Sequence, residues 1–465
     1  MSPTVALFVW FVLLVAVLYF DPARDRSVSS AIWIPIVWIF IAATRLPSLW
    51  IGMRVPSASQ ALEDGNLLDR TVYLVLIGLA LATLFYRSFN WGQFLSRNLV
   101  LLAFVAFALI SVCWSDFPFV TFKRWFRDLG NYLVILVVLS DRQPVEAIRT
   151  LLRRLAFLFL PLSILLFKYY RAIGTQYDDA GRVMYVGPTT GKNLLGVLGL
   201  VCILFFFWDT MMRWSQRRAR KVKAMLYVDL FFAVMSIWVL HLANSTTCRV
   251  CALLGCSIIV AAHSKWGQRH YRILAIVVPA SFGIYALLSW GLGMSGELAA
   301  VVGKDPTLTD RTEIWAFLLN MHTNPLLGTG YESFWLGSRL KLFWENSGQG
   351  QINEAHNGFL EMYLNLGLIG VFLISAILVS NYRKAVRNLR HVSSIAPFSL
   401  AFWLVMVFYC VTEAGFRSGL MWSVFLLGTM SVPERPTHTA KTGWKAKSLV
   451  ALNATTKQKQ PKAIA

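Results

Sequence analysis

The chain has 465 residues, of which 57% are hydrophobic and 14% are charged, and its mean hydropathy is +0.57. So few charged residues cannot cover that much apolar surface in water, and the composition therefore excludes an ordinary soluble protein. The formal net charge is +21, but the basic residues gather in short segments between apolar runs. This distribution is typical of the cytoplasmic loops of membrane proteins and argues against nucleic acid as a partner.

Apolar runs of about 14 to 20 residues recur along the chain, as expected of helices that cross a bilayer. The clearest runs are Val5–Phe20, Thr71–Tyr86, Leu99–Trp114, Asn193–Trp208, Val228–Ala243, Ile273–Leu292, Phe359–Ser380, Ile395–Val411 and Gly419–Val432. The shorter or charge-flanked runs are Ala31–Ala43, Trp125–Leu139, Ala156–Phe167 and Val250–Ala262. The sequence therefore predicts an all-α integral membrane protein with about 12 or 13 transmembrane helices.

Four groups of basic residues between these runs predict the orientation of the helices, because such groups stay in the cytoplasm. The groups lie at Arg142–Arg154, Arg213–Lys223, Lys265–Arg272 and Arg383–Arg390. A count of about 13 helices then places the N-terminus outside, and a count of about 12 places it inside. The predicted organisation is N-terminal transmembrane helices over residues 1–292, a large outer loop over 293–357, C-terminal transmembrane helices over 358–432 and a basic, disordered cytoplasmic tail over 433–465.

Several cations fall on the predicted outer side, where the orientation rule disfavours them. Each one alone can be a solvated or snorkelling side chain. Together they indicate a phosphate group held at the outer edge of the bilayer, because the guanidinium fork matches phosphate geometry. The cations are Lys123, Arg124, Arg127, Arg182, Lys192, Arg249, Arg311 and Arg417.

The outer loop contains a predicted short helix that begins near Asp310. Asp310 is a candidate N-cap and Glu313 takes the third helical position, as in a capping box, and apolar residues follow at helical spacing up to Met321. Arg311 in the first turn, together with the free N–H groups of the helix start, forms a candidate anion site. The alternative is that Arg311 only pairs with Asp305 or Asp310.

His356 lies where the outer loop meets the next apolar run, in "NEAHNGFLEMY". A lone histidine at a helix end is commonly a hydrogen-bonded bystander, but an imidazole can also accept a proton at neutral pH. His356 shares the outer membrane edge with the cations, which makes it the candidate catalytic residue. Asn357 and Glu361 are expected to support it.

The sequence predicts neither a metal ion nor a cofactor. The pair Cys248 and Cys251 has no second ligand pair, and we interpret both residues as small apolar filler. No pair of acidic residues shows a convincing spacing for metal ligands.

Three longer motifs follow one another after the first apolar runs: "DPTLTDRTEIW", "NPLLGTGYESFW" and "AHNGFLEMYLNLGLIG". In this order they resemble the signature region of the O-antigen ligase and polysaccharide polymerase superfamily, with the exopolysaccharide-polymerase branch as the nearest. The shorter motifs "WSDFP", "GKNLLG" and "STTCR" add to the resemblance, which covers most of the chain from about Trp114 onward. One departure concerns Arg249, because a Ser-Arg-like pair is usual there and this chain has Thr247-Cys248-Arg249.

The resemblance implies a membrane-embedded, metal-independent glycosyltransferase that acts on the periplasmic face of the bacterial inner membrane. The implied donor is an oligosaccharide on polyprenyl diphosphate, and the acceptor is either another glycan, in a polymerase, or lipid A core, in a ligase. The lipid bilayer and other polysaccharide-export proteins are the remaining expected partners. A flippase or transporter for a lipid-linked glycan is the competing interpretation, although two related halves are not evident in the sequence.

In this family arginines are associated with the diphosphate and a histidine with the reacting centre. The matching positions here are Arg249, Arg311 and His356. His356 would either accept the proton of the acceptor hydroxyl or bind the diphosphate, and the sequence leaves both roles open. Further expected contributors are Lys123, Arg124 and Lys192 for the diphosphate, and Asp310, Glu313, Asn357 and Glu361 as supporting residues.

Overall fold

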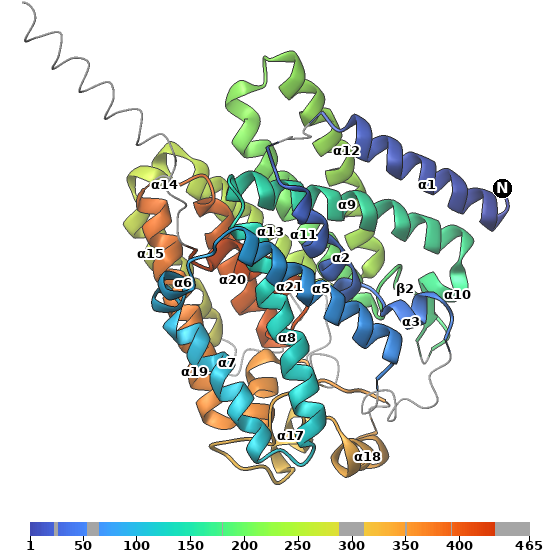
Figure 1. Cartoon of the computed structure of the whole chain (residues 1–465), viewed down its shortest axis with the longest axis vertical. Coiled ribbons are helices and arrows are strands. Elements are labelled where there is room, and N and C mark those ends of the chain that lie inside the picture. Colours follow the sequence, from blue (N-terminus) through green and yellow to red (C-terminus); the bar gives the residue numbers. More distant parts are fainter. Residues whose placement is uncertain are drawn as a thin grey trace, which may run out of the picture.

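The structure is a computed structural model, and it is a bundle of helices (Figure 1). In the described ranges the regular β-structure is one antiparallel hairpin, in which β1 (Thr175–Tyr177) pairs with β2 (Val183–Tyr185). Two short helices, α17 (Arg311–Asn320) and α18 (Gly337–Asn346), lie at one end of the bundle, which we call the loop end. The opposite end carries α14 (Lys265–Arg269). The described residues are 1–22, 27–53, 65–178, 180–287, 311–348, 351–391 and 393–432.

The predicted apolar runs coincide with helices, as far as they lie in the described ranges. The longer helices are α1 (Pro3–Phe20), α2 (Trp33–Ala43), α5 (Leu67–Tyr86), α7 (Leu99–Ile110), α8 (Pro118–Leu139), α9 (Pro144–Tyr169), α11 (Lys192–Arg213), α12 (Arg220–Ala243), α13 (Thr246–His263), α15 (Tyr271–Ala286), α19 (Gly358–Arg390), α20 (Ala396–Thr412) and α21 (Leu420–Thr429). Short helical segments are η1 (Ser30–Ile32), α3 (Pro47–Trp50), α6 (Trp91–Arg97), η2 (Ser111–Cys113), α10 (Arg171–Gly174) and η3 (Trp214–Gln216).

The all-α integral membrane fold is confirmed, but its helices differ in how completely they could span a bilayer. Among the described residues, seven helices are long and apolar enough to cross, and α6 with α7 would form an eighth span, bent by 93°. The remaining predicted runs fold as apolar helices of 10–17 residues or, in α8, share a helix with charged residues. The predicted count of about 12 or 13 helices thus comprises these seven, α7 and five further apolar runs, of which Ile273–Leu292 extends beyond the described residues.

The core of the bundle is built around α11, which packs against α9, α12 and α13. Glycines on α11 permit this close packing. A side chain at Gly196 would collide with Ser245, and one at Gly199 would press on the backbone of Leu240. Small residues at such contacts let helix backbones approach closely, which is the main source of helix association in lipid.

α19 contains a break that fixes the outer loop. Gly367 has a φ of 63° inside the helix, so the backbone groups around it have no partners within the helix. Segment 324–330 supplies them: the Leu368 N–H donates to the Pro325 carbonyl at 2.8 Å, and the Gly330 N–H donates to the Asn365 carbonyl at 2.9 Å. The outer loop is thereby attached to the first part of α19.

A buried ionic network joins α9, α11 and α12 toward the end opposite the loops. Arg153 pairs with Asp209 at 2.7 Å and also contacts Asp229, while Arg149 and Arg213 pair with Asp209 at 2.5 and 3.2 Å. The side chains of Asp209 and Asp229 are fully buried. We call these five residues the Asp209 network, which ties three helices together.

Candidate functional site

A polar cluster at the loop end joins α17 and α11 to the loops beside α19 and α20. Arg311 Nη2 donates to Glu413 Oε1 at 2.7 Å, and His356 Nδ1 lies 3.4 Å from Glu413 Oε2. His356 Nδ1 is also 3.2 Å from Glu354 Oε1, and Asn193 Nδ2 donates to Glu413 Oε1 at 3.0 Å. We call these five residues the His356 cluster. It brings together two of the three predicted catalytic residues.

Of the two groups that share the hydrogen bond, the imidazole is the more accessible, because the His356 side chain is 20% exposed and the Glu413 side chain only 4%. Burial alone would lower the pKa of His356, but the hydrogen bond to Glu413 and the charges of Glu354 and Glu413 outweigh it, so the pKa of His356 is raised. Burial would raise the pKa of Glu413, but the hydrogen bond from His356 and the charge of Arg311 leave that pKa lowered. Each partner thus stabilises the charged form of the other.

The loop before α19 fixes the direction of His356. Its φ is +48°, a left-handed conformation that is uncommon for a residue with a side chain. On one side Trp315 Nε1 donates to the Ala355 carbonyl at 2.8 Å, and on the other Asn357 caps α19 by accepting from the N–H groups of Phe359 and Leu360. Strained residues held in this way concentrate at functional sites. The predicted supporting residue Asn357 therefore acts through the backbone.

Arg311 has a donor left over. The residue is 6% exposed, and its Nη1 is buried without a hydrogen-bond partner in the described part of the chain. A buried charged donor without an acceptor is costly, and an anionic oxygen would satisfy it. Asp305 and Asp310, which the sequence offered as partners and as helix cap, lie outside the described residues; the partner that the structure shows is Glu413.

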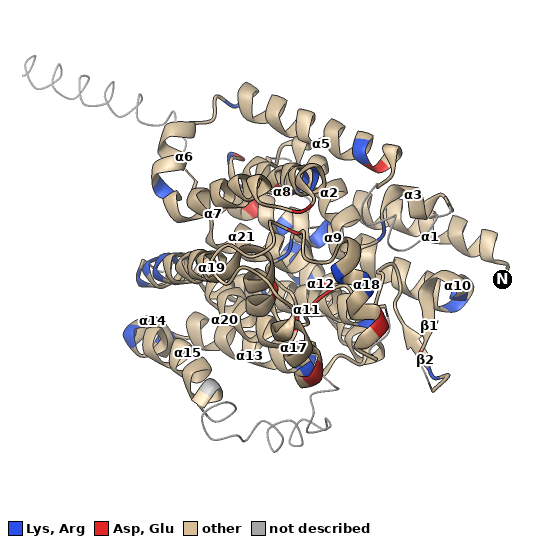
Figure 2. Ribbon diagram, turned by 90° about the horizontal axis from the view of Figure 1, so that it is seen from below, with Lys and Arg blue, Asp and Glu red and all other residues tan. Residues whose placement is uncertain are grey.

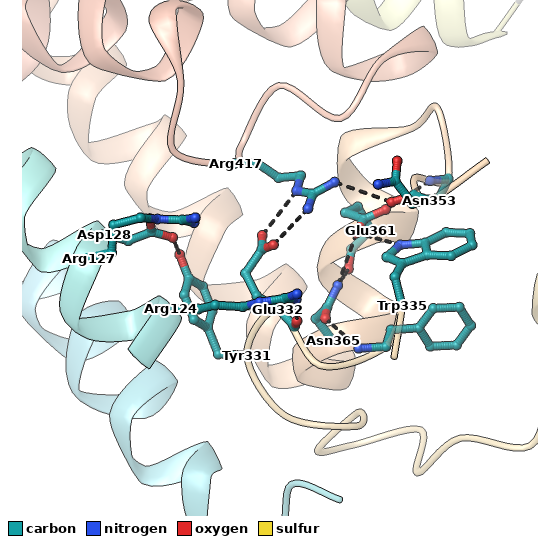
Figure 3. A network of polar contacts seen from close by, with 12 residues as sticks. Arg124, Arg127, Asp128, Tyr331, Glu332, Trp335, Asn353, Glu361, Asn365 and Arg417 are labelled. Carbon is teal, nitrogen blue, oxygen red and sulfur yellow. Dashed lines mark hydrogen bonds and ion pairs between the residues drawn. The ribbon is translucent and has the colours of Figure 1, made fainter. Parts of the chain in front are cut away.

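Figure 3 shows a second polar cluster, which contains Arg417 and Glu332. Arg417 Nη2 and Nε donate to the two carboxylate oxygens of Glu332 at 2.8 and 3.2 Å, and Nη1 donates to the Asn353 carbonyl at 3.4 Å. Arg124 of α8 donates to the Glu332 carbonyl. We call Arg124, Glu332, Asn353 and Arg417 the Arg417 cluster. The short loop after α20 supplies Glu413 to one cluster and Arg417 to the other, so the two are adjacent.

Within the Arg417 cluster, Glu332 and Arg417 stabilise each other's charged forms. Burial would raise the pKa of Glu332, but the charges of Arg417 and Arg124 outweigh it and the pKa is lowered. Burial would lower the pKa of Arg417, but Glu332 and other nearby carboxylates leave it raised. Glu332 also has a positive φ, of 55°. Arg124, predicted to help bind a diphosphate, therefore belongs to this ion-paired cluster and not to the His356 cluster.

Glu361, a predicted supporting residue, is 1% exposed and positions the loops (Figure 3). Its carboxylate accepts hydrogen bonds from Trp335 Nε1 and from the Ala355 N–H, both at 2.9 Å, and from Asn365 Nδ2 at 3.2 Å. These bonds connect the first turn of α19 to the residue just before His356. Glu361 thus positions the backbone next to His356 through hydrogen bonds.

Arg249 occupies a different place from Arg311 and His356. It lies in the first turn of α13, and its Nη2 donates to the His241 carbonyl at 3.1 Å and to Asn244 Oδ1 at 3.0 Å. The Arg249 side chain also lines a groove of about 1120 Å³ between α11, α12 and α13, whose walls are mostly apolar. Thr247 near it bonds Thr412 at 2.9 Å, next to Glu413, so the arginine lies at the same end of the bundle as the His356 cluster.

The other predicted cations have separate roles. Lys192 is exposed at the first residue of α11, next to Asn193 of the His356 cluster. Lys123 lies over the ring of Phe119, with Nζ 4.9 Å from its centroid. Glu313 is exposed on α17. Lys192 is therefore the predicted cation best placed to approach a ligand of Arg311.

Sequence reasoning missed Glu354, Glu413 and Asn193. Glu413 is 57 residues from His356, and no local spacing links residues so far apart. The available signal was an acidic residue directly after an apolar run, since ionisable groups at the membrane are costly and tend to be functional. Ligand atoms of Glu354, His356 and Glu413 lie within 4.8 Å of one another, so the fold brings together a potential metal-ligand set that the sequence did not reveal.

Comparisons with known proteins agree with the motifs. Residues 230–375, which include Arg249, Arg311 and His356, match the O-Antigen ligase family. Over 365 residues the chain is 24% identical to the exopolysaccharide production protein ExoQ of Rhizobium meliloti (strain 1021), and the alignment covers 75% of this chain and 79% of ExoQ. The family match and the ExoQ alignment both support similarity of this chain to the O-antigen ligase and polysaccharide polymerase superfamily.

Proposed function

We propose that the protein transfers a glycan from polyprenyl diphosphate to an acceptor sugar, at the periplasmic face of the inner membrane, during synthesis of a surface polysaccharide. The observation that carries the proposal is the pairing at the loop end. A buried arginine with an unused donor, Arg311, lies beside an accessible imidazole, His356, and one carboxylate, Glu413, holds both. The similarity to ExoQ, whose name refers to exopolysaccharide production, favours polymerisation over ligation.

Arg311 serves the leaving group in this proposal. When the bond between the anomeric carbon and the diphosphate oxygen breaks, the electron pair and the growing negative charge stay on the diphosphate. A fixed guanidinium in a water-poor site stabilises that charge without reorganisation. Arg311 Nη1 has no other acceptor among the described residues, and Lys192 lies near enough in the fold to add a second positive charge.

His356 serves the acceptor. Its Nδ1 faces Glu413 and Glu354, so with the proton on Nδ1 the Nε2 atom is free to accept. The acceptor hydroxyl oxygen forms the new bond to the anomeric carbon, and its proton moves to Nε2. The two carboxylates then stabilise the imidazolium, as the aspartate does in a catalytic triad. This geometry favours the role of general base over that of diphosphate ligand.

The groove beside Arg249 suits the lipid part of the donor. Its walls include Phe206, Leu230 and Leu253, and Arg249 lies along it. An isoprenoid chain is apolar and ends in a diphosphate, so it matches an apolar groove with an arginine near the loop end. We assign to Arg249 the first contact with the lipid diphosphate. Arg311 then holds the diphosphate during transfer.

The proposed reaction uses fixed cations in place of a metal ion. Arg311 already bonds to Glu413 Oε1 and brings a positive charge into the middle of the potential ligand set. A divalent ion bound there would face that charge at short range, which is unfavourable in a buried site.

The experiment that tests the function uses purified protein in detergent with a polyprenyl-diphosphate donor and its glycan acceptor. We expect glycosidic products from the unaltered protein and none from R311Q. A flippase would give no product in detergent, because there are no separate compartments. Polymerase and ligase differ in the acceptor used: extension of a second lipid-linked glycan indicates a polymerase, and transfer to lipid A core alone would contradict the preferred assignment.

The periplasmic orientation has its own test, by cysteine labelling in intact cells. Lys341 is exposed on α18 at the loop end and Lys265 is exposed on α14. In a C113S background, which removes an exposed native thiol, a membrane-impermeant reagent should label K341C and leave K265C unlabelled. The reverse pattern would overturn the orientation.

A further inference from the structure

A second large groove lies away from the candidate site. Its volume is about 1120 Å³, and it is formed by α19 with parts of α6, α7, α9 and α21. The basic residues that line it on α19 follow Gly367 by 16 or more positions, which places them roughly 24 Å farther along the helix. Figure 2 shows basic residues at this end of α19 and on α14. The groove therefore belongs to the end of the bundle that we orient toward the cytoplasm.

The charges of the groove are all of one sign. Arg97, Arg383, Lys384 and Arg387 line it, and none of the described residues that line it is acidic. Lys384 Nζ contacts the neutral Asn98 Oδ1 at 3.1 Å, and Arg97 Nη1 contacts the Val432 carbonyl at 3.4 Å. No ion pair to a carboxylate involves these four cations in the described part of the chain.

The Asp209 network, toward the same end, shows that this arrangement is not general. There Arg149, Arg153 and Arg213 each pair with a buried carboxylate. The fold therefore neutralises one set of arginines internally and leaves the set on α19 facing a groove. An external anion is the missing partner.

The rest of the lining is apolar. Val100, Leu139, Phe372 and Val379 belong to this lining, and Phe372 and Val379 lie closer to Gly367 along α19 than the basic residues do. A soluble anion would leave this apolar wall uncovered, and a neutral lipid would leave the cations unpaired. Basic pockets between transmembrane helices on the cytoplasmic side suit anionic lipid head groups.

We propose that this groove binds one anionic phospholipid of the inner leaflet, with its head group on Arg383, Lys384 and Arg387 and its acyl chains along Phe372 and Val379. Residues 433–465 follow the groove in the sequence but carry seven basic residues and one acidic residue. Charge repulsion therefore disfavours that segment as the occupant. The proposal does not depend on the reaction at the loop end.

The test is a lipid titration of the purified full chain, measured by native mass spectrometry with phosphatidylglycerol or phosphatidylcholine. The variant is R383Q/R387Q, which leaves the contact between Lys384 and Asn98 intact. The matched control is R269Q/R272Q, which removes two exposed cations near the same end. We expect phosphatidylglycerol to bind about fivefold more weakly for each cation removed, so roughly 25-fold in the variant, with the control unchanged.

Three results would overturn the proposal. The first is an equal effect, or no effect, in both variants. The second is equal binding of phosphatidylcholine by the unaltered protein. The third is displacement of phosphatidylglycerol by inorganic phosphate, which would identify a phosphate site in place of a lipid site.

Discussion

The His356 cluster and the Asp209 network use arginines and carboxylates at opposite ends of one bundle, and both contain buried donors without a partner among the described residues. They differ in what can reach them. The cavity beside Arg153 in the Asp209 network holds about 10 Å³, which is enough for at most one water. His356, by contrast, is partly exposed and lies on a loop with a positive φ.

The two clusters also differ in their building elements and in their chemistry. The Asp209 network is carried by three helices and contains only arginines and aspartates. The His356 cluster is assembled from loops and helix ends, and contains an imidazole, which changes charge near neutral pH. Under the proposed function, one ion cluster stabilises the bundle and the other carries out the reaction, and four predictions test this division.

The largest effect is expected from H356A. Loss of a positioned general base should reduce glycosyl transfer about 10²–10⁴-fold, while thermal stability in detergent should stay the same because the side chain is at a partly exposed loop. H270A, at a half-buried position on the opposite end, serves as the control. Full transfer activity in H356A would assign the reaction to another residue.

D209A, unlike H356A, should lower the stability of the folded protein. Removal of this carboxylate leaves Arg149, Arg153 and Arg213 without their shared partner, and breaking a buried ion pair costs about 3–5 kcal/mol. We expect a lowered unfolding temperature and a parallel loss of folded protein in detergent. If D209A stayed as stable as the parent but lost transfer, the network would have a direct role in the reaction.

E413Q should alter the pH dependence of transfer. The base form of His356 is neutral, so the rate rises as pH increases through the pKa of His356. Glu413 helps to raise that pKa, and its neutral replacement should move the acid limb of the profile to lower pH. The loss of a charged hydrogen bond should also reduce the maximal rate about 10- to 100-fold. E313Q, at an exposed position of α17, should change neither the acid limb nor the maximal rate. An acid limb that moved to higher pH would contradict the proposed pairing.

Metal removal should have the smallest effect. In the proposed function Arg311 supplies the positive charge, so we expect the rate of transfer in the presence of a strong chelator to equal the rate without it. A loss of activity that added divalent cations restored would instead assign Glu354, His356 and Glu413 as metal ligands.

The sequence was informative where local patterns determine structure. Hydropathy located the helices, and the helical spacing after Asp310 predicted α17, which spans Arg311–Asn320. The predicted outer-side location of Arg311 and His356 also singled out two residues that the fold brings to one carboxylate. Each of these predictions depended on neighbours within a few turns of the chain.

The rest of the site depends on contacts between distant segments. Glu413 meets Arg311 and His356 across 102 and 57 positions, so only the packed helices reveal it. Arg124 looked like a free cation, but the loop around Glu332 pairs it with a carbonyl far along the chain. The break in α19 at Gly367, where segment 324–330 bonds to the helix, is visible only in the backbone conformation.

The binding of a polyprenyl-diphosphate donor to H356Q, in the absence of an acceptor, tests the central claim most directly. In the proposed function Arg311 holds the diphosphate and His356 only accepts the proton, so H356Q should bind the donor with the affinity of the parent protein and transfer nothing, while R311Q should lose affinity. Equal losses of donor affinity in H356Q and R311Q would contradict the account and assign His356 to the diphosphate itself.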